Sequence, residues 1–301
     1  MLKKFILKQS KTQISLIVIL GLMILGQVGF VLYKGHSSFN ISDAAKAIGL
    51  VIPREKHFEV ASVKELDHVF KNWNYTLTKA TSEGKVPRLF LAKLPRDMHR
   101  KEKSSNPAFI QVLLPHILKV NEQILADRAR LLDMQKRQKA GHRLLYAEKM
   151  WLSKLASNYR CKSTKIESLL MHVDIVPPSL ALAQATIETG GGRSYAAVKK
   201  NSTFGHMRTK KDVARFESLQ ANVLAYITNL NRHAAYKSFR QIRANLRAQN
   251  KPLCGRMLAA GLLSFSERKH AYIRDVQNLI DHRDLRRYDT MTLDQHMRLK
   301  P

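Results

Sequence analysis

The sequence contains few cysteines and no pattern typical of a metal centre. Cys161 and Cys254 are its two cysteines, too few for a disulfide framework, and no C-x-x-C spacing occurs. They either form a single bridge in an oxidising compartment or remain unpaired core residues. The histidines form no H-E-x-x-H pattern, so the sequence predicts no metal site. The chain also lacks internal repeats.

Acidic side chains are scarce. The 301 residues include 23 Asp and Glu against 52 Lys and Arg, which gives a formal net charge of +29. This balance favours polyanionic neighbours such as nucleic acid, anionic lipid or a charged polymer. The basic stretches 136–139 and 208–211 lack the interleaved aromatic residues of a nucleic-acid platform, so we do not expect nucleic acid as a partner. The hydrophobic content of 45% is sufficient for a globular core.

Residues 14–33 form a run of twenty residues without a charge, after a start rich in lysine. A helix of this length spans a hydrocarbon core of ~30 Å. A cleaved signal peptide would have a shorter apolar region with a small-x-small site close behind it, whereas Ala45–Ala47 lies well beyond this run. We therefore expect an uncleaved, single-pass anchor in the inner (cytoplasmic) membrane. The positive-inside rule then places the C-terminal domain in the periplasm.

The remaining pattern is mostly helical. Ser62-Val63-Lys64-Glu65 fits a capping box that begins a helix. Apolar residues spaced by three, four and seven predict further helices from Pro107 onward. The tail from Arg286 is polar and basic, so we expect it to be frayed. The buried face predicted for the helix over 143–159 consists of Leu144, Leu145, Met150, Trp151 and Leu155. The predicted parts are a cytoplasmic tail (1–11), a transmembrane anchor (12–34), a juxtamembrane linker with a short N-terminal subdomain (35–105), a helical domain (106–285) and a basic tail (286–301).

The stretch from Val176 to Gly205 carries the main candidate for chemistry. Pro177 and Pro178 suit the first turn of a helix, and the glycines at 190–192 end it. Glu188 then lies in the last turn, near the negative end of the helix dipole and among apolar residues. Both surroundings raise the pKa of Glu188, as a general acid requires. The alternative is a polar helix end with a glycine cap and no catalytic role.

Four segments in this order resemble the Bax-type proteins of the bacterial glucosaminidase superfamily, which is related to glycoside hydrolase family 73. These segments are Val173–Gly192, Asn201–Gly205, Phe216–Tyr236 and Gly261–Ile280. The resemblance implies a mostly α-helical, lysozyme-like domain with at most a small β-element, behind the single N-terminal transmembrane helix. It also identifies Glu188 as the residue that matches the catalytic acid of the family.

The resemblance assigns further residues to a sugar cleft. Asn201, Phe204 and Gly205 match an element that walls the cleft in such folds, and Tyr272 matches a recurrent tyrosine. Gln184 lies one helical turn before Glu188, where it either orients the carboxyl group or binds the substrate. The chain departs from the family at Gly191, where the family has tryptophan, at Thr189, where it has serine, and at Phe265, where tyrosine is frequent. Loss of the tryptophan weakens sugar stacking and favours a wetter site, which would lower the pKa of Glu188.

Glycoside hydrolysis usually uses two carboxylates. The candidates for the second are Asp212, Glu217 and Glu267. A substrate-assisted route, in which the N-acetyl group takes the place of the nucleophile, needs no second carboxylate. The sequence leaves both routes open.

The resemblance and the predicted anchor together imply a membrane-anchored peptidoglycan hydrolase. It would cleave β-1,4 glycosidic bonds of amino-sugar chains as an N-acetylglucosaminidase, without a metal or organic cofactor. Its expected partners are peptidoglycan glycan strands and the inner membrane, through residues 14–33. The alternative is a non-catalytic peptidoglycan-binding or scaffold protein on a degenerate domain.

Overall fold

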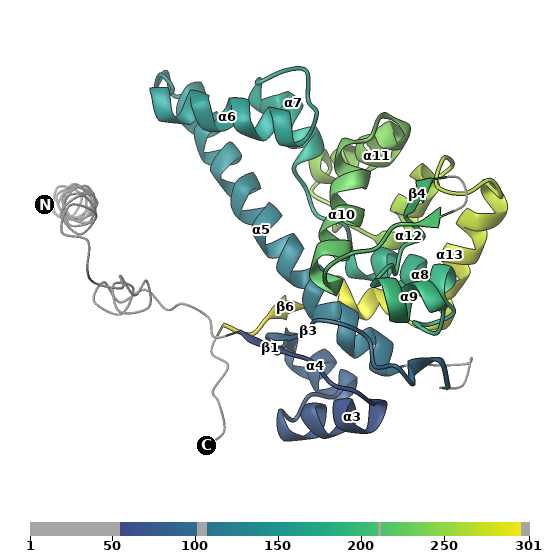
Figure 1. The fold of residues 1–301 in the computed structure, drawn as a ribbon. Helices are drawn as coiled ribbons and strands as arrows, with labels where there is room; N and C mark the ends of the chain where they lie inside the picture. The colour runs from purple at the N-terminus through teal and green to yellow at the C-terminus, as the bar shows by residue number, and fades with distance from the viewer. Residues whose placement is uncertain (1–54, 101–106, 210–211, 296–301) are drawn as a thin grey trace, which may run out of the picture. The chain divides into compact units, whose positions relative to one another are not determined.

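A computed structural model describes residues 55–100, 107–209 and 212–295, all of which belong to one compact unit (Figure 1). Most of these residues are helical, as the sequence predicted. The α-helices are α3 (Val63–Asn72), α4 (Leu77–Glu83), α5 (Pro107–Lys139), α6 (Tyr146–Asn158), α7 (Ile166–His172), α8 (Pro178–Thr189), α9 (Tyr195–Lys200), α10 (Leu219–Arg232), α11 (Lys237–Ala248), α12 (Gly255–Leu258) and α13 (His270–His282). Short 3-10 turns are η1 (Met98–Arg100), η2 (Ala234–Tyr236), η3 (Ala259–Gly261) and η4 (Leu285–Tyr288).

The strands in the described part of the chain are short and form three separate two-stranded sheets. Two of the pairs are parallel and join segments far apart in the sequence, and the third is an antiparallel hairpin. The pairs are β1 (Lys56–Phe58) with β3 (Leu89–Leu91), β2 (Lys85–Val86) with β6 (Thr292–Leu293), and β4 (Met207–Thr209) with β5 (Asp212–Val213). The β component is therefore small.

Helix α5 is the longest described element, and most of its buried residues lie between Ala108 and Ile124. It packs against α7, α8 and α10 and against the strands β3 and β6, and it continues through Pro115. In Figure 1 it runs obliquely from β3 and β6 to α6. Leu66, Phe90 and Leu180 belong to one core, so residues before and after the predicted boundary at 105 pack together.

Serine side chains begin two of the predicted helices. The Ser62 hydroxyl oxygen accepts from the Glu65 N–H at 3.2 Å, and the Ser218 hydroxyl oxygen accepts from the Ala221 N–H at 3.1 Å. Such bonds satisfy backbone donors that have no partner inside the helix. The predicted helix start at Ser62 is confirmed.

The buried face predicted for the helix over 143–159 is wrong in part. Leu155 is buried, but Leu145 and Met150 are exposed. The charged residue Glu148 occupies the buried side instead, where it accepts from the Leu145 N–H and pairs with Arg137. The N-cap residue Leu145 and Met150 of α6 therefore face solvent.

The segment from Arg286, expected to be frayed, is folded as far as Gln295. Tyr288, Met291 and Leu293 are buried, and β6 pairs with β2 near the start of the described chain. The prediction failed because the partners of these apolar residues come from parts of the chain that are distant in sequence.

No helix in the described ranges has the length and apolar character needed to cross a membrane. The predicted anchor at residues 14–33 and the tail at 1–11 lie outside the described residues. Both therefore remain predictions.

Candidate active site

Helix α8 carries Glu188, and its first turn is held by the C-terminal segment. Pro178 occupies the first helical position, where its missing N–H costs no hydrogen bond. The Ser179 N–H and hydroxyl both donate to the Asp289 carboxylate, each at 2.8 Å. Burial raises the pKa of Asp289 to about 6, although the bonds from Ser179 act in the opposite direction.

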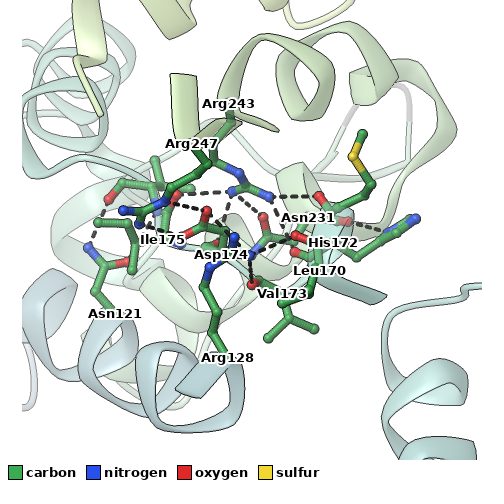
Figure 2. A network of polar contacts seen from close by, with 12 residues as sticks. Asn121, Arg128, Leu170, His172, Val173, Asp174, Ile175, Asn231, Arg243 and Arg247 are labelled. Carbon is green, nitrogen blue, oxygen red and sulfur yellow. Dashed lines mark hydrogen bonds and ion pairs between the residues drawn. The ribbon is translucent and has the colours of Figure 1, made fainter. Parts of the chain in front are cut away.

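A buried arginine supports the loop that leads into α8 (Figure 2). Arg243 of α11 donates to the carbonyl oxygens of Asp174 at 2.9 Å and of Ile175 at 3.0 Å. The same nitrogen donates to the side-chain oxygen of Asn231 at 2.7 Å. These carbonyls lie in a loop where no helix or strand bonds them, so the arginine supplies the missing donors. Burial lowers the pKa of Arg243 to about 10, which leaves it a cation at neutral pH.

Two more arginines and an asparagine complete this network (Figure 2). Arg247 donates to both carboxylate oxygens of Asp174, at 2.8 and 3.0 Å, and Arg128 of α5 lies 3.5 Å from the same carboxylate. Burial alone would raise the pKa of Asp174, but these arginines hold it below its ordinary value. Asn121 of α5 pairs with both backbone groups of Val176. Helices α5 and α11 therefore fix the direction in which α8 begins.

A left-handed turn ends α8 directly after Glu188. The φ angles of Gly190, Gly191 and Gly192 are 59°, 73° and 84°, in the region that favours glycine. The Thr189 hydroxyl accepts from the Gly192 N–H at 2.7 Å and closes the turn. A Cβ atom on Gly192 would lie 2.4 Å from the ring of Phe109. The glycine run therefore ends the helix as predicted and allows the turn to pack on α5.

A chain of hydrogen bonds leads from the core to Glu188. The Tyr226 hydroxyl donates to Oε1 of Gln184 at 2.6 Å, and Nε2 of Gln184 donates to the Tyr272 hydroxyl at 3.0 Å. The Tyr272 hydroxyl in turn donates to Oε1 of Glu188 at 2.9 Å. The amide orientation is assigned from these bonds, since it gives every group a complementary partner. Oε1 is thus occupied as an acceptor, and Oε2 is left to carry an acidic proton.

Burial raises the pKa of Glu188, and the hydrogen bond from Tyr272 offsets part of that rise. Burial and the nearby Glu188 charge raise the pKa of Tyr272, so its hydroxyl remains a donor at neutral pH. A carboxyl group with a raised pKa keeps its proton closer to neutral pH, which suits a general acid.

Glu188 lines a cleft of about 600 Å³. One wall is a single face of α10, whose lining residues recur at intervals of three or four. The other walls come from the segment 204–207, which leads into β4 and includes its first residue, from η2 and from the turn before α13. The lining residues besides Glu188 are Phe204, Gly205, His206, Met207, Ala221, Leu224, Ala225, Thr228, Asn229, Arg232, Tyr236 and Phe265.

Gly205 lies directly against the carboxyl group. A Cβ atom at this position would be 2.7 Å from Oε2 of Glu188, and the φ of Gly205 is 65°. Glycine is therefore required here for both space and backbone conformation. Phe204 stacks on Tyr226 with 3.8 Å between ring centroids. Phe204 and Gly205 both line the cleft together with Glu188.

The structure does not bring Gln184 and Asn201 into the cleft. Gln184 is fully buried behind Tyr272, because α10 and α13 cover that side of α8. It contacts Tyr272 rather than the open cleft. Asn201 is also buried, and its amide donates to the Phe216 carbonyl oxygen at 3.1 Å. Asn201 holds the loop before β4 through these contacts and does not line the cleft.

None of the three candidates for a second carboxylate lines the cleft. Asp212 pairs with Lys200 at 2.7 Å and with Arg208 at 2.8 Å. Glu217 and Glu267 are exposed. Glu188 is the one carboxylate among the described residues that line the cleft.

Among the lining residues that the sequence did not predict are His206 and Arg232. His206 follows Gly205; burial lowers its pKa, and its Nδ1 atom has no partner in the described part of the chain. Arg232 ends α10 and makes no ion pair with a described residue. A signal for Arg232 was present, because positions 221, 225, 228 and 232 share one helix face. His206 offered no signal, since nothing local shows that it borders Glu188.

Comparison with known proteins identifies the family. The profile of the glucosaminidase family, described as mannosyl-glycoprotein endo-beta-N-acetylglucosaminidase, matches residues 166–285. Protein bax of Escherichia coli (strain K12) is 32% identical over 198 residues, which cover 60% of this chain and 69% of that protein. The chain belongs to the Bax-type proteins of the glucosaminidase superfamily. No solved structure matches it significantly.

The aromatic surface of this Bax-type chain does not come from the turn after Glu188. Gly191, at the position of the family tryptophan, has a φ of 73°, a conformation that side-chain-bearing residues rarely adopt. Tyr236 and Phe265 line the cleft instead, and Phe265 stacks on Tyr272 with 5.4 Å between centroids. In the described part of the chain, the aromatic residues that line the cleft are therefore Phe204, Tyr236 and Phe265.

The described residues contain neither a disulfide bond nor a metal-binding cluster. Cys161 and Cys254 are free thiols, the second of the two alternatives that the sequence left open. Within the described ranges, no group of three or more His, Cys, Asp or Glu residues is arranged to hold a metal ion.

Proposed function

We propose that this Bax-type protein is a peptidoglycan hydrolase that cleaves β-1,4 glycosidic bonds of amino-sugar chains, with Glu188 as the general acid. The observation that carries the proposal is a carboxyl group with a raised pKa, held by Tyr272, at the wall of a cleft lined by aromatic residues. Membership of the glucosaminidase superfamily supports the substrate class. We further propose a lysozyme-like fold and N-acetylglucosaminidase specificity.

In the proposed reaction, Glu188 gives its proton to the leaving glycosidic oxygen. Oε1 accepts from Tyr272, so the transferred proton leaves from Oε2, beside Gly205. As the C–O bond breaks, positive charge develops on the sugar ring and negative charge on Glu188. The Tyr272 hydroxyl already points at the carboxylate and stabilises it as it forms.

We propose that the substrate supplies its own nucleophile, because Glu188 is the one carboxylate among the described lining residues. The acetamido oxygen attacks the anomeric carbon as the leaving oxygen takes the proton from Glu188. A water molecule then opens the cyclic intermediate and returns a proton to Glu188. The alternative route needs a second carboxylate that enters the cleft only when the substrate is bound and then activates a water molecule.

The lining of the cleft suits a charged glycan. Tyr236 and Phe265 offer ring faces to sugar rings, and Arg232 offers a cation without a described ion-pair partner. The peptide stems of peptidoglycan carry free carboxylates. Residues 14–33 would anchor the protein in the inner membrane, with the described domain in the periplasm.

One digestion experiment tests the proposal. The purified full chain in detergent, as wild type and as Glu188→Gln, is incubated with isolated sacculi, and the released fragments are analysed by mass spectrometry. We expect wild type to release fragments with reducing N-acetylglucosamine and Glu188→Gln to lose at least about 100-fold in rate, since a general acid contributes 10²–10⁴-fold. Retained activity in Glu188→Gln would remove this residue from the mechanism. Fragments with reducing N-acetylmuramic acid would make the protein a muramidase.

The alternative is a non-catalytic wall-binding or scaffold protein. Gly191 at the family tryptophan position and the single carboxylate in the cleft favour it. Sacculi that bind wild type but release no fragments would establish this alternative. Localisation is tested separately: a C-terminal reporter active only in the cytoplasm would contradict the proposed export.

A further inference from the structure

The turn between α5 and α6 exposes large apolar side chains. We call residues 136–150 the α5–α6 tip. Leu145, Tyr146 and Met150 within it are 65%, 79% and 55% exposed. Tyr146 and Met150 are four positions apart on α6, so they share a helix face. In Figure 1 the tip lies at the end of α5 away from α8 and α10, which both contribute residues to the cleft. It is therefore a surface separate from the proposed active site.

The same region is strongly basic. The tip contains five Lys or Arg and one acid, Glu148, so its net charge is 5 − 1 = +4. Arg137 pairs with both Glu148 and Asp133, which leaves no unpaired carboxylate at the tip. Exposed cations without an ion pair to any described residue remain beside the apolar patch: Lys136, Lys139, Arg143 and Lys149.

Hydrogen bonds hold the tip in one conformation. Glu148 accepts from the Leu145 N–H at 2.9 Å and also pairs with Arg137, which ties the start of α6 to the end of α5. The ion pair places Glu148 on the buried side of α6 and leaves Tyr146 and Met150 on the exposed side. The exposed apolar surface is therefore a fixed feature of the turn.

We propose that the α5–α6 tip binds the surface of an anionic lipid bilayer. Headgroup phosphates match the unpaired cations, and the boundary of the acyl region removes Leu145, Tyr146 and Met150 from water. Tyrosine suits this position because its ring is apolar and its hydroxyl is polar. A second copy of the chain would bring +4 against +4, and a hydrated anionic polymer would leave the apolar residues in water. The proposal requires neither catalysis nor the predicted anchor.

A fluorescent label on the tip tests this contact in the full chain. Cys161→Ser and Cys254→Ser remove the native thiols, and Tyr146→Cys carries a polarity-sensitive fluorophore. We expect a blue shift on vesicles rich in phosphatidylglycerol and none on pure phosphatidylcholine. The same label at Met257→Cys, an exposed position on α12, should not respond. A label at 146 that stays water-exposed on anionic vesicles would overturn the proposal, as would a response to isolated sacculi but not to lipid.

Charge variants separate specific docking from general attraction. Lys139→Gln with Arg143→Gln should lower the ratio of lipid-bound to free label about 25-fold, since each cation near an anionic surface contributes about fivefold. The matched pair Lys237→Gln with Lys251→Gln removes two exposed cations outside the tip and should change that ratio little. Equal effects of the two pairs would show attraction by net charge alone and contradict the proposal.

Discussion

Glu188 acquires its chemistry from residues that lie far from it in the sequence. Tyr272, which donates to its carboxylate, is 84 positions away. Gly205 leaves room for Oε2, and Gln184 fixes the hydroxyl of Tyr272 from behind. Tyr272 and Gln184 are positioning residues, because they act on the substrate only through Glu188.

Tyr272→Phe tests the hydrogen bond to Glu188. The hydroxyl stabilises the ionised carboxylate, so its removal raises the pKa of Glu188 further. A general acid works in its protonated form, and the alkaline limb of the kcat/KM profile on sacculi should therefore move to higher pH. We expect the maximal rate to fall about tenfold, which corresponds to a hydrogen bond of ~1.5 kcal/mol to a charged group. Tyr159→Phe, at the end of α6, is the control; an unchanged pH profile in Tyr272→Phe would contradict the assignment.

Gly205→Ala tests the close approach of Gly205 to the carboxyl group. The substitution strains a φ of 65° and places a Cβ atom 2.7 Å from Oε2. Gly84→Ala is a matched control, because Gly84 has a φ of 62° and no atom within 4 Å of the added Cβ. Both variants should lose about 1 kcal/mol of unfolding free energy, since each places a side chain in a left-handed conformation. Only Gly205→Ala should also lose activity, by at least about tenfold; equal activities would show that the contact does not affect catalysis.

The structure places some of the predicted site residues at the cleft and others away from it. Phe204 and Gly205 lie beside Glu188, whereas Gln184 and Asn201 are buried away from the cleft. Helical spacing showed that Gln184 and Glu188 share a face, but it could not show that other helices cover Gln184. Arg232 was missed because a cation in a last helical turn also fits a purely structural role.

At the scale of elements, α8 depends on a loop that contains no regular structure. The carbonyls of Asp174 and Ile175 need donors, and Arg243 supplies them from α11. The α8 helix itself was readable from Pro178 and Gly190, which are local signals. The direction of α8 was not, because it is set by side chains of α5 and α11.

Arg243→Met tests this dependence. The variant keeps a long apolar stem but leaves several buried carbonyls and Asn231 without their donor. We expect a loss of about 3–5 kcal/mol in the free energy of unfolding by guanidinium, the range found when one partner of a buried charged network is removed. Gln241→Met, on the exposed side of the same helix, should change it little. A loss below ~1 kcal/mol would mean that water replaces the arginine at these carbonyls.

At the scale of the whole molecule, the C-terminal segment completes the domain that carries the cleft. β6 pairs with β2, and Asp289 bonds the first turn of α8. The last described residues thus connect the start of the described chain to the helix of Glu188. The sequence predicted a frayed tail because most residues of this segment are polar or basic. Its few apolar residues, Tyr288, Met291 and Leu293, are nevertheless buried.

Asp289 should make the stability of the molecule depend on pH. Its pKa is about 6 in the folded chain and has an ordinary value of 3.8, so the folded state binds more protons between these values. The stabilisation that Asp289 gives to the folded state is complete below about pH 4 and is lost as the pH rises through about 6. Asp289→Asn keeps a bond to the Ser179 N–H and removes the titration. Between pH 4 and pH 7 the wild type should lose up to ~3 kcal/mol of unfolding free energy relative to the variant. A difference between the two proteins that stays constant with pH would contradict the raised pKa.

The sequence by itself determined the family, the mostly helical class, and the helix ends at Ser62, Pro178 and Gly190. These features depend on groups within a few residues of one another, so the local sequence contains all of their causes. Only the tertiary structure decided which face of α6 is buried, whether the tail folds, and which groups surround Glu188. Burial and a raised pKa arise from residues that meet in space across long stretches of chain. Glu188 was conspicuous in the sequence, but its hydrogen bond to Tyr272 and its contact with Gly205 exist only in the folded molecule.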